Sequence, residues 1–188
     1  FAEKYIKLFK EINLSIFDHV IVVGGGTIID VIAYTTSIFK RGITYSVVPT
    51  TLMSQVDVVS GGKTCINFLN TKNLLGTFHY PTISYLNSNF LITEHPINKR
   101  QGMSEIFKYA LLNSKKLLNL ILKEDEVNKK ILEETIQARY RIRQIHSLAS
   151  NLGHTFGHAL EKYYNHKILH GDAISAGIII SLYFLLFK

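Results

Sequence analysis

The stretch VIVVGGGTIID, residues Val20–Asp30, decides the fold of this chain. Its first four residues form a short, fully apolar run, which is typical of a buried parallel strand. Three glycines follow at once, and residues 27–39 then have the pattern of a helix. Strand, glycine turn and helix make up half of a βαβ unit. The sequence therefore predicts a parallel α/β fold around this stretch.

The segments on either side extend this α/β pattern. Residues Phe1–Asn13 carry apolar side chains at helical spacing, with lysines between them. Residues Ile43–Val48 predict a second strand, closed by Pro49, and residues Thr82–Leu86 predict a third strand. The polar, glycine-bearing stretch Ser54–Gly76 predicts loop and short helix.

The second half of the chain has a different texture, because lysines and glutamates alternate with apolar positions at helical spacing. The predicted helices cover residues 102–113, 115–122, 126–145, 150–165 and 173–187. We therefore expect a Rossmann-like α/β portion over residues 1–94, followed by an all-α metal-binding domain over residues 95–188.

Composition limits the classes of partner. Hydrophobic residues make up 47% of the chain and charged residues 19%, which indicates a globular protein. The net charge of +7 fits either a solvated basic surface or an anionic small substrate. No recognition-helix or RNP signature is present, so we expect no nucleic-acid partner. The apolar stretch Ile178–Phe187 is too short to span a bilayer, so we expect no membrane.

The cysteine content suggests a cellular compartment, and the two ends of the chain suggest that it is a fragment. Cys65 is the single cysteine, which excludes an intrachain disulfide and favours a reducing, cytoplasmic compartment. The chain starts at Phe1 without an initiator Met or a signal-peptide pattern. It stops at Lys188, inside an apolar pattern. We interpret it as a piece of a longer protein.

The glycine stretch is a candidate phosphate-binding loop. Glycines let the backbone approach a diphosphate, and the helix that follows offers free N–H groups at its positive end. Asp30 lies too close to these glycines to be the usual ribose-binding acid, which belongs at the end of the next strand. A tight strand-to-helix turn without a ligand explains the same residues, so both interpretations stay open.

Histidines in the helical half form a candidate metal site. His154 and His158 are four residues apart on a predicted helix and therefore share a face. His170 follows in the sequence Leu-His-Gly-Asp, and Glu105 lies on an earlier predicted helix. Two histidines and a carboxylate suit zinc and leave a position open for a substrate. The alternative is that these are ordinary surface histidines.

Cationic and polar residues close to glycines suggest capture of a phosphate or carboxylate. The alternative for each of them is an ordinary solvated side chain. The sequence GGKT at residues 61–64 looks like the end of a P-loop, but the preceding strand and the first glycine are missing, so we reject that interpretation. These residues are Arg41, Asp57, Lys63, Lys72, Asn73 and Lys108.

Taken together, these segments resemble the 3-dehydroquinate synthase family within the sugar-phosphate cyclases. The resemblance covers most of the chain, and the segments appear in the order that the family has. The matching segments are GGGTIID at 24–30, FKRG at 39–42, VPTTL at 48–52, QVDVVSGGKT at 55–64, KNLLG at 72–76, GMSEIFKY at 102–109, NLGHTFGHA at 151–159 and LHGDA at 169–173.

The resemblance implies a two-domain enzyme with NAD on the Rossmann-like domain, a metal on the helical domain and the active site in the cleft between them. The implied ligands of zinc, or of cobalt, are Glu105, His154 and His170. The implied NAD-binding residues are Gly25, Gly26, Asp30, Thr50, Thr51 and Lys72. The implied substrate-binding residues are Arg41, Lys63, Asn73, Lys108, Asn151 and His158, and the implied catalytic residues are Asp57, Lys63, Lys108 and His158.

The implied reaction converts 3-deoxy-D-arabino-heptulosonate 7-phosphate to 3-dehydroquinate and phosphate, in the shikimate pathway of aromatic amino-acid biosynthesis. The family habit also implies a homodimer. NAD is reduced and reoxidised within one cycle, so the net reaction is a lyase-type elimination.

One region departs from the family pattern. An acidic loop is absent before Asn151, Arg143 stands where a lysine is usual, and Ser147 occupies the place of an arginine. Either a loop is missing from the chain or the protein is impaired. This departure leaves two alternatives open, a related cyclase that acts on a heptulose phosphate without the carboxylate and a non-catalytic scaffold. An alcohol dehydrogenase of the glycerol dehydrogenase type, which shares the fold, is a third alternative.

Overall fold

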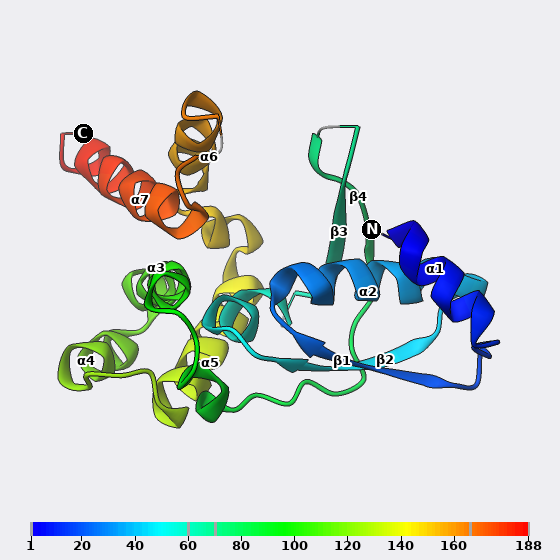
Figure 1. Ribbon diagram of the computed structural model, residues 1–188. Coiled ribbons are helices and arrows are strands. Elements are labelled where there is room, and N and C mark those ends of the chain that lie inside the picture. Colours follow the sequence, from blue (N-terminus) through cyan, green and yellow to red (C-terminus); the bar gives the residue numbers. More distant parts are fainter. Residues whose placement is uncertain (1, 60, 70, 166, 188) are drawn as a thin grey trace. The chain divides into compact units, whose positions relative to one another are not determined.

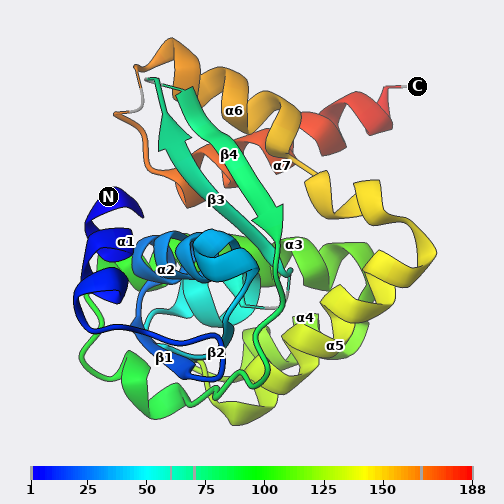
Figure 2. The same cartoon turned by 90° about the vertical axis from the view of Figure 1, so that its right-hand side faces the viewer.

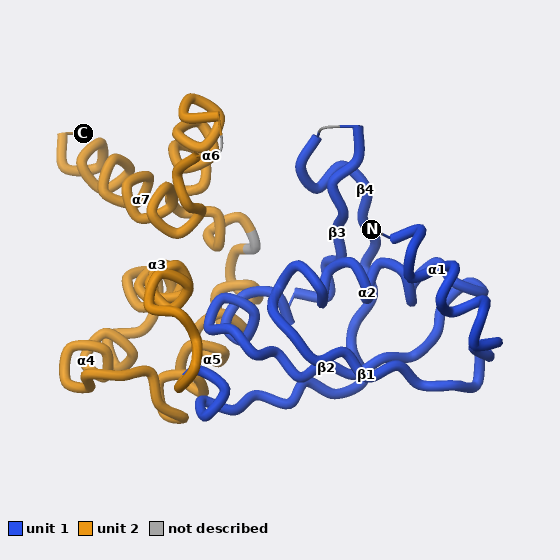
Figure 3. The backbone as a smooth tube through the Cα atoms, in the orientation of Figure 1, with its two compact units in different colours: residues 1–91 blue, residues 92–188 orange. Residues whose placement is uncertain are grey.

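The computed structural model describes residues 2–59, 61–69, 71–165 and 167–187, and it leaves the side chain of Ser147 undescribed. Ser60, within the matching segment 55–64, lies outside the described residues. The chain forms two compact units, Phe1–Leu91 and Ile92–Lys188 (Figure 3). The division expected from the sequence was between residues 94 and 95.

The first unit is built around a βαβ crossover. It begins with α1 (Ala2–Glu11), followed by β1 (His19–Gly24), α2 (Gly26–Ile38), the 3₁₀ turn η1 (Phe39–Arg41) and β2 (Thr44–Pro49). β1 and β2 pair in parallel, with His19 opposite Thr44 and Gly24 opposite Pro49. The strand, turn and helix predicted at Val20–Asp30 are therefore present (Figure 1).

The core of this unit lies between the parallel strands and the helices α1 and α2. Alternate residues of β2 are buried, as expected for a strand with one face against helices. The thirteen-residue α2 also buries Thr35 and Thr36, whose hydroxyl groups donate to the carbonyl oxygens of Val31 and Ala33 at 2.7 and 2.9 Å. The buried cluster consists of Phe9, Val22, Ile29, Ile32, Ala33, Tyr45, Val47 and Val59.

The expected third strand is reduced to a single bridge. Ser84 forms a parallel bridge with Val47, whose backbone N–H donates to Ile83 O at 2.9 Å. Beyond this bridge, the carbonyl oxygen of Asn87 accepts a hydrogen bond from the side chain of Gln55 at 3.0 Å instead of pairing with β2. The predicted strand Thr82–Leu86 was thus wrong in extent. The short 3₁₀ helix η3 (Ser88–Leu91) ends the unit.

The stretch predicted as loop and short helix holds a β-hairpin instead. After the π-helix η2 (Ser54–Val58), β3 (Lys63–Phe68) and β4 (Thr71–Phe78) pair antiparallel. α2 lies between this hairpin and the strands β1 and β2 (Figures 1 and 2).

Polar contacts hold the hairpin against α2. Such contacts produce no periodic pattern of apolar residues in the sequence. The hydroxyl oxygens of Thr64 and Thr77 lie 2.7 Å apart, and Thr77 donates to Ser37 Oγ on α2 at 2.7 Å. Outward residues such as Phe68 and Leu74 are about half exposed, at 48% each. The prediction from the sequence was wrong here because hydrogen bonds replace the alternation that marks a half-buried strand.

The second unit is helical, as predicted. Its elements are α3 (Pro96–Asn113), α4 (Lys115–Lys123), α5 (Lys129–Ile145), the 3₁₀ helix η4 (Ser147–Asn151), α6 (His154–Tyr163) and α7 (His170–Leu186). None of the described helices combines the length and apolar character that crossing a membrane requires.

Several helix boundaries in this unit differ from the prediction; α5 begins at Lys129 instead of residue 126, and α7 begins at His170 instead of residue 173. Two larger differences have a local cause. α3 begins earlier, at Pro96, because His95 Nδ1 accepts from the backbone N–H of Ile97 and proline suits the first helical turn. The predicted helix at residues 150–165 is split, because Gly153 has a φ of +79° and separates η4 from α6.

Candidate functional site

Three residues on three helices come together in the second unit. Glu105 lies within α3, His154 is the first residue of α6 and His170 is the first residue of α7. His154 Nε2 lies 3.9 Å from Glu105 Oε1, and one ligand atom from each of the three residues lies within 4.8 Å of the others. The Glu105 side chain is only 1% exposed. The structure thus gathers the three residues expected to be metal ligands.

Glycines allow α6 and α7 to approach closely enough for this convergence. A Cβ atom on Gly177 would stand 2.1 Å from the carbonyl oxygen of Gly153 and 2.8 Å from the amide nitrogen of Gly157. A Cβ on Gly157 would meet Ile174 Cδ1 at 2.7 Å. Backbone therefore packs against backbone where the two helices contact each other, and their histidines lie close together.

Polar contacts fix the start of α7 on α3. The side-chain oxygen of Gln101 accepts hydrogen bonds from the backbone N–H groups of Gly171 at 2.6 Å and Asp172 at 3.3 Å. Arg100 forms an ion pair with Asp172 at 2.9 Å. A Cβ on Gly171 would lie 2.6 Å from the carbonyl oxygen of Gln101, so glycine is required there. These contacts place His170 opposite Glu105, and sequence reasoning did not find Gln101.

The electrostatics of this cluster favour a neutral imidazole at His154. Lys108, 2% exposed, forms an ion pair with Glu105 one turn away on α3. Burial, together with the positive charge of Lys108, lowers the pKa of His154 to about 4. His154 is therefore neutral at neutral pH, and a neutral imidazole nitrogen has the lone pair that a metal ion needs.

A further histidine and a carboxylate border the cluster. The ring centroid of His158 lies 5.4 Å from that of His154 and 6.1 Å from that of His170. Glu161 is buried, with Oε1 3.0 Å from His170 Nδ1 and Oε2 3.9 Å from His158 Nε2. Sequence reasoning missed Glu161, although its position seven residues after His154 places both on one face of α6.

The donor set fits zinc. Two imidazole nitrogens and one carboxylate oxygen match the ligands of catalytic zinc sites, which keep a further position for water or substrate. His158, Glu161 and His170 form a second group of possible ligands within the described residues, and it shares His170 with the first.

The first unit gathers four of the residues expected to bind NAD. The backbone N–H of Thr50 donates to Gly24 O at 2.9 Å, which joins the loops after β1 and β2. A Cβ on Gly25 would lie 3.2 Å from Thr51 Cγ2, and a Cβ on Gly26 would lie 3.1 Å from Val58 Cγ2. The carboxyl ends of parallel strands are where α/β sheets bind ligands.

Asp30 belongs to a polar cluster between α2 and the hairpin. Cys65 Sγ lies 3.9 Å from Asp30 Oδ2 and 3.2 Å from Asn73 Oδ1. Burial and the charge of Asp57 raise the pKa of Asp30 to about 7, although the Cys65 thiol acts in the opposite direction. Lys72 is also near, because its charge partly offsets the rise in the pKa of Cys65. Asp30, Asp57, Lys72 and Asn73 are therefore neighbours.

Comparison with protein families gives two adjacent matches. Residues 2–101 match the model described as 3-dehydroquinate synthase N-terminal, and residues 102–186 match 3-dehydroquinate synthase C-terminal. The chain belongs to the 3-dehydroquinate synthase family. The residues gathered in the two units therefore lie within the N-terminal and C-terminal matches of one family.

Curated relatives in the 3-dehydroquinate synthase family match nearly the whole chain. The 3-dehydroquinate synthase of Sulfurisphaera tokodaii is 38% identical over 194 residues, which cover 95% of this chain and 55% of the relative. That of Pyrococcus abyssi is 38% identical over 166 residues, covering 83% of this chain and 50% of the relative. The chain thus spans about half the length of the curated relatives it matches.

Solved structures share the fold of this family member. 2-epi-5-epi-valiolone synthase from Streptomyces hygroscopicus subsp. jinggangensis superposes with a TM-score of 0.83 at 25% identity, over 94% of this chain and 54% of that chain. 2-deoxy-scyllo-inosose synthase gives a TM-score of 0.83 at 25% identity, over 95% of this chain and 53% of that one. Glycerol dehydrogenase from Schizosaccharomyces pombe, at 14% identity and a TM-score of 0.62, shares the fold alone.

Three residues expected from the family resemblance stand outside the clusters described above. Arg41 ends the 3₁₀ turn after α2, at the opposite end of that helix from the glycine loop. Lys63 is the exposed first residue of β3, and Asn151 is the exposed last residue of η4. The described contacts of each unit do not link these three residues to the clusters.

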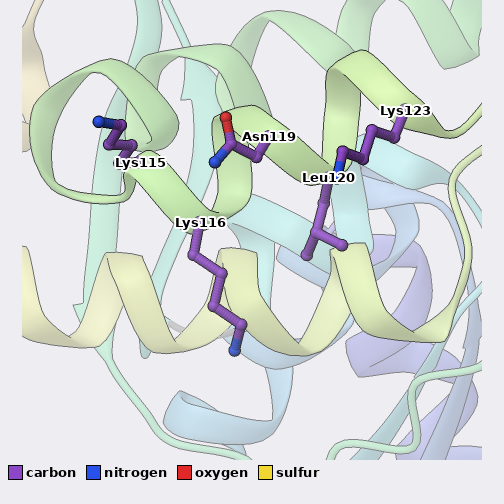
Figure 4. Close-up of a pocket in the computed structure, with 5 residues that line it drawn as sticks. All are labelled: Lys115, Lys116, Asn119, Leu120 and Lys123. Atoms are coloured by element: carbon purple, nitrogen blue, oxygen red, sulfur yellow. The ribbon is translucent and has the colours of Figure 1, made fainter.

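A shallow hollow on α4 is separate from the candidate metal centre of this family member (Figure 4). Its volume is about 380 Å³, and no residue of the metal cluster lines it. Lys116 on α4 forms an ion pair with Glu134 on α5, with Nζ 2.7 Å from Oε2. The hollow therefore lies over a structural ion pair. It is lined by Lys115, Lys116, Asn119, Leu120 and Lys123.

Proposed function

We propose that the protein is a 3-dehydroquinate synthase, which converts 3-deoxy-D-arabino-heptulosonate 7-phosphate to 3-dehydroquinate and phosphate with the help of zinc and NAD. The observation that carries this proposal is the convergence of Glu105, His154 and His170 on one point of the helical unit. Curated relatives with this name, at 38% identity over most of the chain, support it.

In this proposal, Glu105, His154 and His170 hold the zinc ion. Zinc bound there supplies Lewis-acid polarisation of a substrate hydroxyl or ketone. The valiolone synthase that shares the fold was solved with NAD+ and Zn2+ bound, which supports the choice of metal. Lys108 forms an ion pair with Glu105, and a lysine at this place favours an anionic substrate close to the ion.

The glycine loop of the first unit is proposed to hold the diphosphate of NAD. Gly25 caps α2 without any side-chain hydrogen bond, so backbone N–H groups remain at the positive end of a thirteen-residue helix. Thr50 and Thr51 border the same loop, and Asp30 and Lys72 lie beyond it. Bound there, NAD would supply a reversible acceptor for a hydride from the substrate.

The remaining predicted residues are proposed to bind the substrate and move its protons. Lys108 and His158 lie beside the metal cluster, where they can pair with an anionic group and hold or release a proton. Asp57 is a neighbour of Asp30 in the first unit. The proposed substrate contacts are Arg41, Lys63, Asn73, Lys108, Asn151 and His158.

Release of inorganic phosphate tests the proposal. The full-length protein is incubated with zinc, NAD and 3-deoxy-D-arabino-heptulosonate 7-phosphate, while phosphate and absorbance at the NADH wavelength are followed. We expect phosphate to accumulate without net NADH, because the hydride returns to the substrate. Net NADH formation would instead indicate a dehydrogenase of the glycerol dehydrogenase type. Inert protein that binds no zinc would indicate a scaffold.

A related sugar-phosphate cyclase is the second candidate function. Ser147 occupies the place of the arginine expected at the substrate carboxylate, and the valiolone synthase matches the fold with a TM-score of 0.83. A heptulose 7-phosphate without a carboxylate separates the two candidates. Faster phosphate release from that compound than from the sugar acid would favour this second function.

We also propose that the protein is a homodimer in the cytoplasm. The single cysteine supports a reducing compartment. Light scattering on the full-length protein measures the oligomer directly, and a monomeric mass at working concentrations would contradict the dimer.

A further inference from the structure

Glu161 is a buried carboxylate that faces two histidines. It lies on α6 and is 4% exposed. Its Oε1 atom lies 3.0 Å from His170 Nδ1, and its Oε2 atom lies 3.9 Å from His158 Nε2. A carboxylate is rarely buried to this degree unless a partner compensates its charge or its hydrogen-bonding capacity. Glu161 therefore has a specific task at the edge of the metal cluster.

The contact between Glu161 and His170 fixes the role of each imidazole nitrogen. A carboxylate oxygen only accepts hydrogen bonds, so Nδ1 of His170 carries the proton and donates a hydrogen bond to Glu161. In the neutral ring the proton on Nδ1 leaves the lone pair on Nε2. The ring of His170 also lies 5.6 Å, centroid to centroid, from that of His154.

His154 follows the same arrangement with a different acceptor. Its Nδ1 atom lies 3.3 Å from the carbonyl oxygen of Leu152, while its Nε2 atom lies 3.9 Å from Glu105 Oε1. In both histidines, therefore, Nδ1 faces an acceptor outside the cluster. Outer carboxylates and carbonyls of this kind hold metal-binding histidines in one tautomer and increase their basicity.

We infer that Glu161 is a positioning residue, which accepts a hydrogen bond from Nδ1–H of His170 and so directs the Nε2 lone pair of that ring to the zinc ion. This inference rests on the metal site of the proposed function and adds a residue that does not touch the metal. Glu161 lies on α6 with His154 and His158, so its contact with His170 joins α6 to the first residue of α7.

Zinc affinity of the full-length protein tests this role. Competition with a chromophoric chelator is measured for the wild type, Glu161→Ala, Glu161→Gln and the control Glu133→Gln, which changes an exposed glutamate on α5. We expect Glu161→Ala to weaken zinc binding by about 10- to 100-fold. Glu161→Gln should weaken it less, because the amide oxygen still accepts a hydrogen bond from Nδ1–H, and the control should match the wild type.

The absorption spectrum of the cobalt-substituted protein gives a second readout, because its bands report the geometry of the ligands. Glu161→Ala should shift these bands and Glu161→Gln should restore them. A merely structural role would change the circular dichroism of the protein and leave the spectrum of the bound metal unaltered.

Three outcomes would overturn the inference. In the first, folded Glu161→Ala binds zinc as tightly as the wild type with an unchanged cobalt spectrum; if that variant does not fold, Glu161→Gln with wild-type affinity has the same meaning. In the second, the wild type binds two zinc ions and Glu161→Ala binds one, which would make Glu161 a ligand together with His158 and His170. In the third, the wild type binds no zinc, which would also defeat the proposed metal site.

Absence of phosphate release with the expected zinc affinities would count against the proposed reaction alone.

Discussion

At the scale of single residues, His154 combines a partly buried position with a neutral charge state. Burial and the nearby Lys108 lower its pKa to about 4, and its Nε2 atom lies 3.9 Å from the Glu105 carboxylate. The arrangement differs from that of an ordinary surface histidine, which is solvated and titrates near pH 6.5.

We predict that His154→Ala abolishes tight zinc binding while the helices remain folded. The substitution removes one of three proposed ligands and shortens a side chain that is about one-fifth exposed (21%), so the packing loss is small. Zinc content by atomic absorption and helix content by circular dichroism measure the two effects. A His154→Ala variant that retains one zinc per chain would contradict the proposed ligand set. His146→Ala, which changes the exposed residue directly before η4, is a control outside the cluster.

The pKa of Asp30 is shifted in the other direction from that of His154. Burial and the charge of Asp57 raise it from 3.8 to about 7. A protein that contains an acid with a raised folded-state pKa loses stability as the pH rises from the unfolded-state pKa to the folded-state pKa of that acid. The loss levels off at higher pH. We predict that Asp30→Asn stabilises the NAD-free protein, by an amount that grows between about pH 4 and about pH 7. Thermal melts at several pH values, with Asp125→Asn as the exposed control, measure the difference. A pH-independent gap would contradict the shifted pKa.

At the scale of helices and strands, close packing of α6 on α7 depends on glycine. Gly177 leaves no room for a side chain, because the carbonyl oxygen of Gly153 would be 2.1 Å from its Cβ. The contact is made by backbone atoms, which cannot move aside as a flexible side chain does.

We predict that Gly177→Ala destabilises the second unit by about 1–3 kcal/mol and weakens zinc binding, because it forces apart the helices that carry His154 and His170. Chemical denaturation and zinc titration measure the two effects. Ile179→Ala, on the exposed face of the same helix, is the matched control, with an expected change within about 0.5 kcal/mol. Equal effects of the two substitutions would show that the glycine contact has no special role.

Helices α4 and α5 are joined by a buried carboxylate. Glu134 accepts hydrogen bonds from Ser114 Oγ at 2.9 Å and Arg141 Nη2 at 2.7 Å, and it pairs with Lys116 at 2.7 Å. Burial by itself raises the pKa of Glu134, but the hydrogen bonds from Lys116, Arg141 and Ser114 outweigh it and lower the pKa to about 2. This contribution to stability is fully present above pH 4.5 and is lost as the pH falls towards about 2.

We predict that Glu134→Gln destabilises the protein by about 1–3 kcal/mol at neutral pH, because it leaves buried donors poorly satisfied. The difference from the wild type should shrink as the pH falls below about 4, where the wild-type carboxylate loses its advantage. Denaturant titrations across this range, with Glu133→Gln as the exposed neighbour, measure it. A constant difference at every pH would refute the assignment of the low pKa.

At the scale of the whole molecule, the proposed binding sites for zinc and for NAD belong to different units. The metal ligands lie on α3, α6 and α7 of the second unit, and the glycine loop lies between β1 and α2 of the first. Each ligand should therefore stabilise its own unit by mass action.

We predict that zinc, at about 100 times its dissociation constant, slows hydrogen exchange of amides in α6 and α7 by up to about 100-fold, with little effect on β1 and α2. NAD should slow exchange at residues 24–30 and 50–51 and leave α6 and α7 nearly unchanged. Exchange measured by mass spectrometry on the full-length protein resolves these segments. Uniform protection of both units by either ligand would contradict the assignment of the two sites.

Local patterns in the sequence were sufficient for the βαβ crossover and for the helical character of the second half. An apolar run followed by three glycines determines its own turn, and helical periodicity is a property of neighbouring residues. The hairpin formed by β3 and β4 escaped prediction because hydroxyl contacts such as Thr77 with Ser37 hold it, and these leave no periodic signal. At residues 82–86 the sequence predicted too much strand. The structure has a single bridge to β2 there, because pairing between distant segments depends on tertiary contacts.

By itself the sequence determined the kinds of groups at the candidate site, because imidazole and carboxylate side chains carry their chemistry wherever they stand. Only the tertiary structure decided which of them meet. Glycine contacts between α6 and α7, and Gln101 on α3, bring three helices to one point, and Glu161 becomes visible as a partner of His170 only when two helices lie side by side. The physical reason is that distances between residues far apart in the chain depend on packing, which no local pattern encodes.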